Sequence, residues 1–241
     1  MEEHLPALRE RFEADLAIVN GENAADGAGI TAKLADKLLA AGADVVTLGN
    51  HTYRRGGIAS YLAGSERVIR PANSGSEAPG RGLAVVEARN GVPVAVLNLL
   101  GQLFLPTPIS PWETVDTLVE EARAAAPVVI VDFHAEATSE KVALATWLDG
   151  RVTAVIGTHT HIQTNDARIL PGGTAAVTDA GMTGPHDSVI GVEAELAIRR
   201  MRTRQPVRFQ PAHGGVRIEG VVVDCTDDGR AERIELLRIP A

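Results

Sequence analysis

The sequence lacks the features that mark membrane-spanning or secreted proteins. No run of about 18 apolar residues is present, and Met1 is followed by acidic residues instead of the basic start of a signal peptide. The single cysteine, Cys225, cannot form an internal disulfide, and its apolar neighbours predict a buried strand position. We therefore expect a cytoplasmic protein with no membrane partner.

Positive charge is also scarce. The formal net charge is -8, which argues against non-specific nucleic-acid binding, because that binding depends on clustered Lys and Arg. An anionic substrate would need local positive charge, and bound metal cations would supply it. The 241 residues, 45% of them hydrophobic and 22% charged, are typical of a folded protein. We expect one domain that spans residues 1–241.

The pattern along the chain predicts an α/β fold. Apolar, β-branched runs predict buried strands at residues 16–19, 45–48, 94–97, 128–131, 154–156 and 174–177. Apolar residues that repeat every three or four positions predict helices within 30–38, 115–122 and 142–148. This alternation implies right-handed crossovers and a largely parallel sheet flanked by helices. The last part predicts a helix at 192–201. The segments 207–210, 216–223 and 233–239 predict an antiparallel meander or a mixed-sheet extension.

Polar side chains follow four of the predicted strands. They lie in the segments Asn20-Gly21-Glu22-Asn23, Gly49-Asn50-His51, Asp132-Phe133-His134 and Gly157-Thr158-His159-Thr160-His161. Ligands of open α/β sheets bind beyond the carboxyl ends of the strands. Oxygen and nitrogen donors without thiolate suit Mn²⁺, Fe or Zn²⁺ better than Ca²⁺. We therefore predict a metal site at this edge.

These motifs, in this order, resemble those of the calcineurin-like metallophosphoesterase superfamily. The longer segments 131–141 (VDFHAEATSEK) and 183–191 (TGPHDSVIG) resemble a small bacterial family of 2',3'-cyclic-nucleotide phosphodiesterases. The resemblance runs over nearly the whole chain and implies a sandwich of mixed sheets flanked by helices. It also implies a phosphoric diester hydrolase with a cyclic nucleotide or phosphodiester substrate, and a homo-oligomer.

Carried over residue by residue, the resemblance implies a dinuclear centre of iron or manganese, with zinc or magnesium as alternatives. Glu22 would bridge the two ions. The ligands of one ion would be Asn50, His134 and His159, and those of the other Asn23 and His161. A metal-bound hydroxide would attack phosphorus. His51, whose imidazole titrates near neutral pH, matches the family's proton donor to the leaving oxygen.

One part of the family pattern is missing. Members of the family begin with a strand that ends in a metal-binding aspartate, whereas residues 1–9 resemble the helix that follows that strand. We therefore expect the first strand to be missing, through a start codon assigned downstream or in a natural one-metal variant. The ion at Asn23 and His161 would then lack its aspartate. Asp26 and Asp179 are conceivable substitutes, although no motif supports either.

Other catalytic signatures are incomplete. Ser139 and Ser188 lack the Gly-x-Ser-x-Gly elbow of serine hydrolases, and Gly27-Ala28-Gly29 lacks the Lys-Ser/Thr ending of a phosphate-binding loop. Two alternatives to the phosphodiesterase stay open. One is a metal-binding regulatory protein with impaired catalysis. The other is a capsule-associated or different hydrolase that shares the Gly-x-His-x-His signature.

Overall fold

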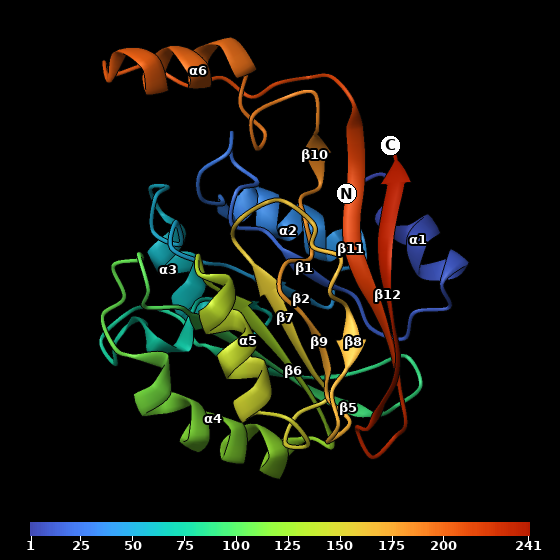
Figure 1. Ribbon diagram of the computed structural model, residues 1–241. Helices are drawn as coiled ribbons and strands as arrows, with labels where there is room; N and C mark the ends of the chain where they lie inside the picture. Colours follow the sequence, from blue (N-terminus) through green and yellow to red (C-terminus); the bar gives the residue numbers. More distant parts are fainter.

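The computed structural model describes residues 1–241 and shows three sheets with helices on both sides (Figure 1). The helices are α1 (Leu5–Arg11), α2 (Ala32–Ala40), α3 (Ile58–Gly64), α4 (Pro111–Ala125), α5 (Thr138–Trp147) and α6 (Ala194–Thr203), with a 3-10 turn at Ala72–Ser74. The strands are β1 (Ile18–Asn20), β2 (Val45–Thr47), β3 (Val68–Ile69), β4 (Leu83–Glu87), β5 (Pro93–Leu100), β6 (Val128–His134), β7 (Ala154–Thr158), β8 (Arg168–Ile169), β9 (Ala175–Val177), β10 (Gly184–Pro185), β11 (Val216–Cys225) and β12 (Ala231–Pro240).

The largest sheet has six strands in the order β4-β5-β6-β7-β9-β8. Its four inner strands run parallel, and its two edge strands, β4 and β8, run antiparallel to their neighbours. Helices α4 and α5 cover one face, where Phe133 and Leu144 belong to a cluster of 18 buried apolar residues. Apart from Asn98 and Asp132, the first part of the parallel interior is apolar on both faces, as expected for strands that are covered on both sides.

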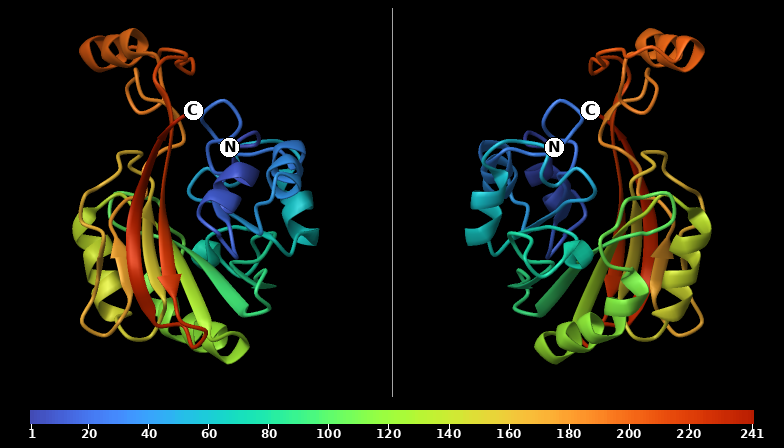
Figure 2. Two further views of the ribbon diagram at one scale, coloured as in Figure 1. Left: turned by 90° about the vertical axis from the view of Figure 1, so that its right-hand side faces the viewer. Right: turned by 90° about the vertical axis from the view of Figure 1, so that its left-hand side faces the viewer.

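A second sheet, of parallel strands β1, β2 and β3, packs against the other face of the large sheet (Figure 2). Val45 and Ile69 from the small sheet share one buried cluster with Val96 and Val128 from the large sheet. Helices α1, α2 and α3 cover the outer face of the small sheet. This arrangement brings the carboxyl ends of strands from both sheets to one place.

The C-terminal strands β11 and β12 form a long antiparallel hairpin. It packs over β7 and β9 through Ala231, Val223 and Ile234. Helix α6 lies between β10 and β11 in the sequence and stands away from the rest of the molecule (Figures 1 and 2). Its only buried residue is Ala197, and the segment 199–208 contains five arginines and no acidic residue.

The structure confirms the predicted mixed α/β architecture and most of its elements. The prediction of a strand at 207–210 is wrong. These residues are largely exposed, and only Pro211 beside them forms an isolated β-bridge, with Val192. The antiparallel meander is therefore formed by β10, β11 and β12. No helix in the chain combines the length and hydrophobicity needed to cross a bilayer.

Tyr61 offers a test of how α2 and α3 pack. Its hydroxyl donates a hydrogen bond of 2.7 Å to Asp36, and burial together with this bond raises the pKa of Tyr61 from 10.0 to about 12. The unfolded phenol ionises near pH 10.0, so this contribution to stability is complete below that pH and is lost as the pH rises toward 12.

We expect absorbance titration of the Tyr53→Phe variant, in which Tyr61 is the only tyrosine, to give a midpoint near pH 12. Adding Asp36→Asn should lower the midpoint part of the way to 10.0. A midpoint that Asp36→Asn leaves in place would contradict the contact.

Candidate metal centre

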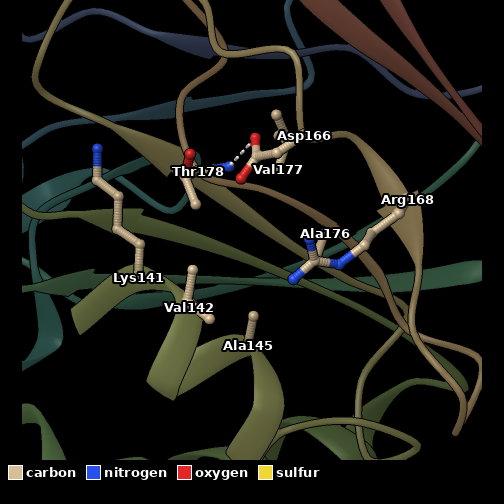
Figure 3. A pocket seen from close by; sticks show the side chains of 8 residues that line it. All are labelled: Lys141, Val142, Ala145, Asp166, Arg168, Ala176, Val177 and Thr178. Atoms are coloured by element: carbon tan, nitrogen blue, oxygen red, sulfur yellow. Dashed lines mark hydrogen bonds between the residues drawn. The ribbon is translucent and has the colours of Figure 1, made fainter. Parts of the chain in front are cut away.

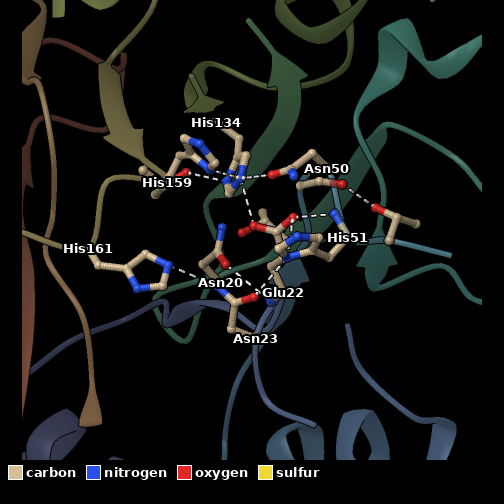
Figure 4. A network of polar contacts seen from close by, with 12 residues as sticks. Asn20, Glu22, Asn23, Asn50, His51, His134, His159 and His161 are labelled. Carbon is tan, nitrogen blue, oxygen red and sulfur yellow. Dashed lines mark hydrogen bonds and ion pairs between the residues drawn. The ribbon is translucent and has the colours of Figure 1, made fainter. Parts of the chain in front are cut away.

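Four predicted ligands converge where the two sheets meet (Figure 4). Glu22 follows β1, Asn50 follows β2, His134 ends β6 and His159 follows β7. Nε2 of His134 lies 2.6 Å from Glu22 Oε2, 3.0 Å from Asn50 Oδ1 and 3.0 Å from His159 Nδ1. Glu22, His134 and His159 also form a group with metal-binding geometry, with ligand atoms within 4.8 Å of one another.

The chemistry of this set fits a cation. At most one proton can lie on Nε2 of His134, whereas three ligand-type atoms meet that nitrogen. One proton cannot satisfy all three, but a cation among them can. Neighbouring ligands of an ion with bonds of about 2.1 Å lie about 3 Å apart, which agrees with these separations.

The tautomer of His134 is set by a buried chain of hydrogen bonds. Thr158 donates its hydroxyl hydrogen to Asp132 Oδ1 over 2.7 Å, so its oxygen accepts from Nδ1–H of His134, 3.0 Å away. The lone pair of Nε2 therefore points toward the other ligands, as in many metal sites. Asn20 and Thr47 also donate to Asp132. Burial raises the pKa of Asp132, and these donors oppose the rise.

His159 is oriented from two sides. Its Nε2 lies 3.0 Å from a carboxylate oxygen of Glu136, which leaves Nδ1 to face His134. The backbone of His159 has a φ of 100°, and that of His161 a φ of 68°. Such left-handed conformations are costly for residues with a Cβ, and they occur often at ligand-binding sites. Here they turn the chain sharply at the end of β7.

A second polar group lies beside the first and contains His51, Asn23 and His161. Asn23 links the two imidazoles, with Oδ1 3.1 Å from His51 Nδ1 and Nδ2 3.0 Å from His161 Nε2. His161 donates Nδ1–H to the carbonyl of Ile190 over 3.1 Å, so its Nε2 lone pair faces the site. Glu22 connects the groups, because its Oε1 accepts the backbone N–H of His51.

Burial and neighbouring side chains shift the pKa values of three residues of the site. It lowers the pKa of His51, an effect that Glu22 only partly offsets, and with His134 it lowers the pKa of His159. Burial would raise the pKa of Glu22, but contacts with His134 and His51 outweigh it and hold the pKa below 4.5. Neutral imidazole and ionised carboxylate are the forms that coordinate metals.

Two glycines allow the strand ends to meet this closely. A Cβ on Gly49 would lie 2.4 Å from Nε2 of His134, so any larger residue would displace the imidazole. A Cβ on Gly157 would lie 2.0 Å from the carbonyl oxygen of Thr178. The Gly-Asn-His and Gly-Thr-His-Thr-His motifs therefore begin with glycine for steric reasons.

A buried ion pair holds the turn that carries His159 and His161. Lys141 Nζ lies 3.0 Å from Asp179 Oδ2, and this oxygen also accepts from the backbone N–H and the hydroxyl of Thr160, at 3.0 and 2.7 Å. Asp179 is fully engaged here, so the suggestion that it replaces a metal-binding aspartate is wrong. The other suggested substitute, Asp26, is 84% exposed and faces Arg55.

Lys141 also borders a small hollow beside α5 that contains none of the predicted ligands (Figure 3). Its lining residues are Lys141, Val142, Ala145, Asp166, Arg168, Ala176, Val177 and Thr178. Asp166 accepts hydrogen bonds there from Thr164 and from the backbone of Thr178. The hollow is separate from the metal-binding group in its residues and its chemistry.

The structure thus brings all seven predicted site residues into one contact network (Figure 4). Sequence reasoning missed the residues that orient them. Asp132 was visible only as a polar residue in a buried strand, two positions before His134. The contacts of Glu136, Thr158 and Lys141 join distant segments and leave no local pattern.

The chain is similar to known proteins over nearly its whole length. A family model described as YmdB-like protein matches residues 1–237. A "2',3'-cyclic-nucleotide 2'-phosphodiesterase" of Bacillus subtilis is 45% identical, covering 99% of this chain and 90% of its own. A "putative phosphatase/phosphodiesterase" of Mycoplasma genitalium is 36% identical, covering 98% of this chain and 86% of its own.

Solved structures show the same fold. A hypothetical protein from Thermus thermophilus superposes with a TM-score of 0.91 at 41% identity, covering 99% of this chain and 93% of its own. A structure described as a novel phosphatase, from Mycoplasma pneumoniae, superposes with a TM-score of 0.90 at 33% identity. The match covers 99% of this chain and 87% of the other. The predicted sandwich of mixed sheets flanked by helices is therefore confirmed.

The chain from Asp132 through Thr158 to His134 predicts that Asp132→Asn weakens metal binding. The NH2 group of the new amide would face the hydrogen-bond donors of Asn20 or of the two threonines. The imidazole of His134 would then be held less firmly in its orientation. We expect the affinity for Mn²⁺ to fall about 10- to 100-fold, measured by titration calorimetry.

The matched control is Asp166→Asn, which also removes a carboxylate bonded to threonine but contacts no predicted ligand. Its Mn²⁺ affinity should equal that of the unmodified protein. Equal losses in the two variants would show that Asp132 acts on general stability instead.

Proposed function

Since the chain belongs to the YmdB-like protein family of calcineurin-like phosphoesterases, we propose that it is a metal-dependent phosphodiesterase that hydrolyses 2',3'-cyclic nucleotides. The observation that carries the proposal is the convergence of Glu22, Asn50 and His159 on Nε2 of His134. The names of the similar proteins support phosphodiester hydrolysis over a purely regulatory role or a capsule-associated activity.

In this proposal Glu22 would contribute ligand atoms to both of two cation sites. Its Oε2 faces His134, while Oε1 lies on the side of His51, Asn23 and His161. The ligands of one ion are then Glu22, Asn50, His134 and His159, and those of the other are Glu22, Asn23 and His161. Iron or manganese as the native metal, a dinuclear state, a single domain, a homo-oligomer and a cytoplasmic location stay predictions of the same proposal.

Bound cations supply two things in this class of reaction, neutralisation of phosphate charge and a water of lowered pKa. The protein's part is to place these charges at an accessible edge of the sheets. The side chains of His51 and His159 are 28% and 17% exposed, whereas Glu22 and His134 are almost fully buried. The substrate therefore approaches from the side of His51 and His159.

His51 is placed to move the proton that the leaving ribose oxygen needs. Its Nδ1 faces Asn23 Oδ1 over 3.1 Å, so Nδ1–H is the donor in that bond. Its Nε2 has no hydrogen-bond partner within the protein and is free to carry a proton to the substrate. An imidazole held in this way serves as a general acid.

The function itself predicts metal-dependent turnover. Protein stripped with chelator and reloaded with Mn²⁺ or Fe²⁺ should hydrolyse 2',3'-cyclic AMP, and the stripped protein should not. Chromatography of the nucleotide products is the measurement. If the reloaded protein binds metal but turns over no cyclic nucleotide, the phosphodiesterase proposal fails.

The role of His51 predicts a dependence on the leaving group. His51→Ala should lower kcat for 2',3'-cyclic AMP about 10²- to 10⁴-fold, because the ribose oxygen leaves poorly without a proton. Bis(4-nitrophenyl) phosphate, whose leaving group is far less basic, should lose much less. Steady-state kinetics with both substrates provides the measurement.

His213→Ala is the matched control, because His213 is exposed and has no hydrogen bond. It should leave both rates unchanged. Equal losses for the two substrates in His51→Ala would argue for a structural role of His51, which metal analysis of the variant would then reveal.

A further inference from the structure

The loop that follows β5 presents an aromatic ring to solvent. Phe104 is 84% exposed, and its backbone lies in the left-handed region with a φ of 65°. Exposure of the ring forfeits the burial energy that a phenylalanine normally contributes. The left-handed backbone adds conformational strain. Both costs fall on one residue, which needs an explanation.

The other phenylalanines are all partnered. Phe133 is fully buried in the core between α4, α5 and the large sheet. The guanidinium of Arg11 covers the ring of Phe12, and that of Arg200 covers Phe209. Phe104 alone is neither buried nor covered by a cation. Its faces are therefore available to a flat ligand.

The segment that carries Phe104 is firmly anchored. Both oxygens of the buried carboxylate of Glu140 accept backbone N–H groups, from Gln102 at 2.8 Å and Leu103 at 3.2 Å. The buried side chain of Asn73 bonds the backbone of Leu100 and of Ile109 at the two ends of the loop. Phe104 is therefore displayed by a fixed support.

The loop that carries Phe104 begins next to a predicted metal ligand. The backbone N–H of Gly101 donates to the carbonyl oxygen of His134 over 3.0 Å. Leu100 pairs with His134 in the parallel register of β5 and β6. Phe104 follows Gly101 by three residues, so their Cα atoms lie within about 11 Å. The loop therefore leaves the large sheet at the same edge as the metal centre.

We propose that Phe104 is the stacking platform for the nucleobase of the substrate, whose cyclic phosphate lies at the metal centre. The proposal rests on the proposed function, because it assigns a place to the part of the substrate that does not react. Every nucleobase has a flat π-face, so a single phenylalanine binds all four with modest discrimination. The metal centre would then select the phosphate, and Phe104 the attached base.

Kinetics with and without a base on the substrate tests the assignment. Phe104→Ala should raise KM for 2',3'-cyclic AMP about 5- to 150-fold, in line with the 1–3 kcal/mol measured for base stacking, while kcat stays within about twofold. For glycerol 1,2-cyclic phosphate, which has no base, neither constant should change. Phe104→Trp should keep the KM of the unmodified protein.

Leu103→Ala is the matched control, because Leu103 is the exposed apolar neighbour of Phe104 and contacts Glu140 only through its backbone. It should leave both substrates unaffected. Equal rises of KM for the two substrates in Phe104→Ala would overturn the proposal. So would a change of sedimentation coefficient in Phe104→Ala but not in Leu103→Ala, because Phe104 would then contact a second copy of the chain.

A binding measurement separates this proposal from the proposed function. In the zinc-loaded Phe104→Trp variant, adenosine 3'-monophosphate should quench the fluorescence of the introduced tryptophan in a saturable manner. Glycerol phosphate should not quench it. The unmodified protein, with Trp112 and Trp147, gives the background. Quenching without turnover of any cyclic nucleotide would contradict the proposed phosphodiesterase activity but support the stacking role of Phe104. Absence of quenching would sink the stacking site, whatever the turnover.

Discussion

A buried carboxylate faces a buried imidazole where the two sheets meet, and neither group meets all the hydrogen-bonding needs of the other. Glu22 comes from the small sheet and His134 from the large one, and each is about 1% exposed. Buried charge is expensive unless it is paired and hydrogen-bonded. Asn50 and His159 add further lone pairs at the same point. The junction is therefore organised around a positive charge, and its surroundings follow from that requirement.

The fold around this junction is arranged to bring strand ends together. Parallel strands place their carboxyl ends on one edge, and stacking of two sheets doubles the number of ends that meet there. Gly49 removes the side chain that would separate β2 from His134, and Gly157 lets β7 approach Thr178. Hydrogen bonds that Asp132 and Asp179 accept then hold the predicted metal ligands in place. Rigid strands set the site, and loops complete it.

The sequence predicted the ligands better than it predicted what holds them. Strand ends such as those before Glu22 and His134 stand out, because polar residues follow a β-branched apolar run. The family resemblance also implied that His159 and His161 belong to different ligand groups. Their left-handed backbones turn the chain between them. The pairing of Lys141 with Asp179 spans 38 positions and has no local signature.

Edges and projections were the least predictable parts of the fold. The short strands β3, β8 and β10 have two residues each and depend on partners that only the folded chain provides. The segment 207–210 has strand-like residues but no neighbouring strand to pair with, so it stays irregular. Local preference cannot decide such cases, because pairing energy comes from tertiary contacts.

The projecting helix α6 has a consequence for the whole molecule. Five arginines lie in 199–208 on a chain whose overall charge is -8, so the body is more acidic than the total suggests. Positive and negative charge are thereby separated along the long direction of the molecule, which gives it a large permanent electric dipole. In an electric field or near a charged surface the protein would turn before it moved closer, and it would present α6 to anything negative. Net charge alone therefore misjudges how this protein behaves on an ion exchanger.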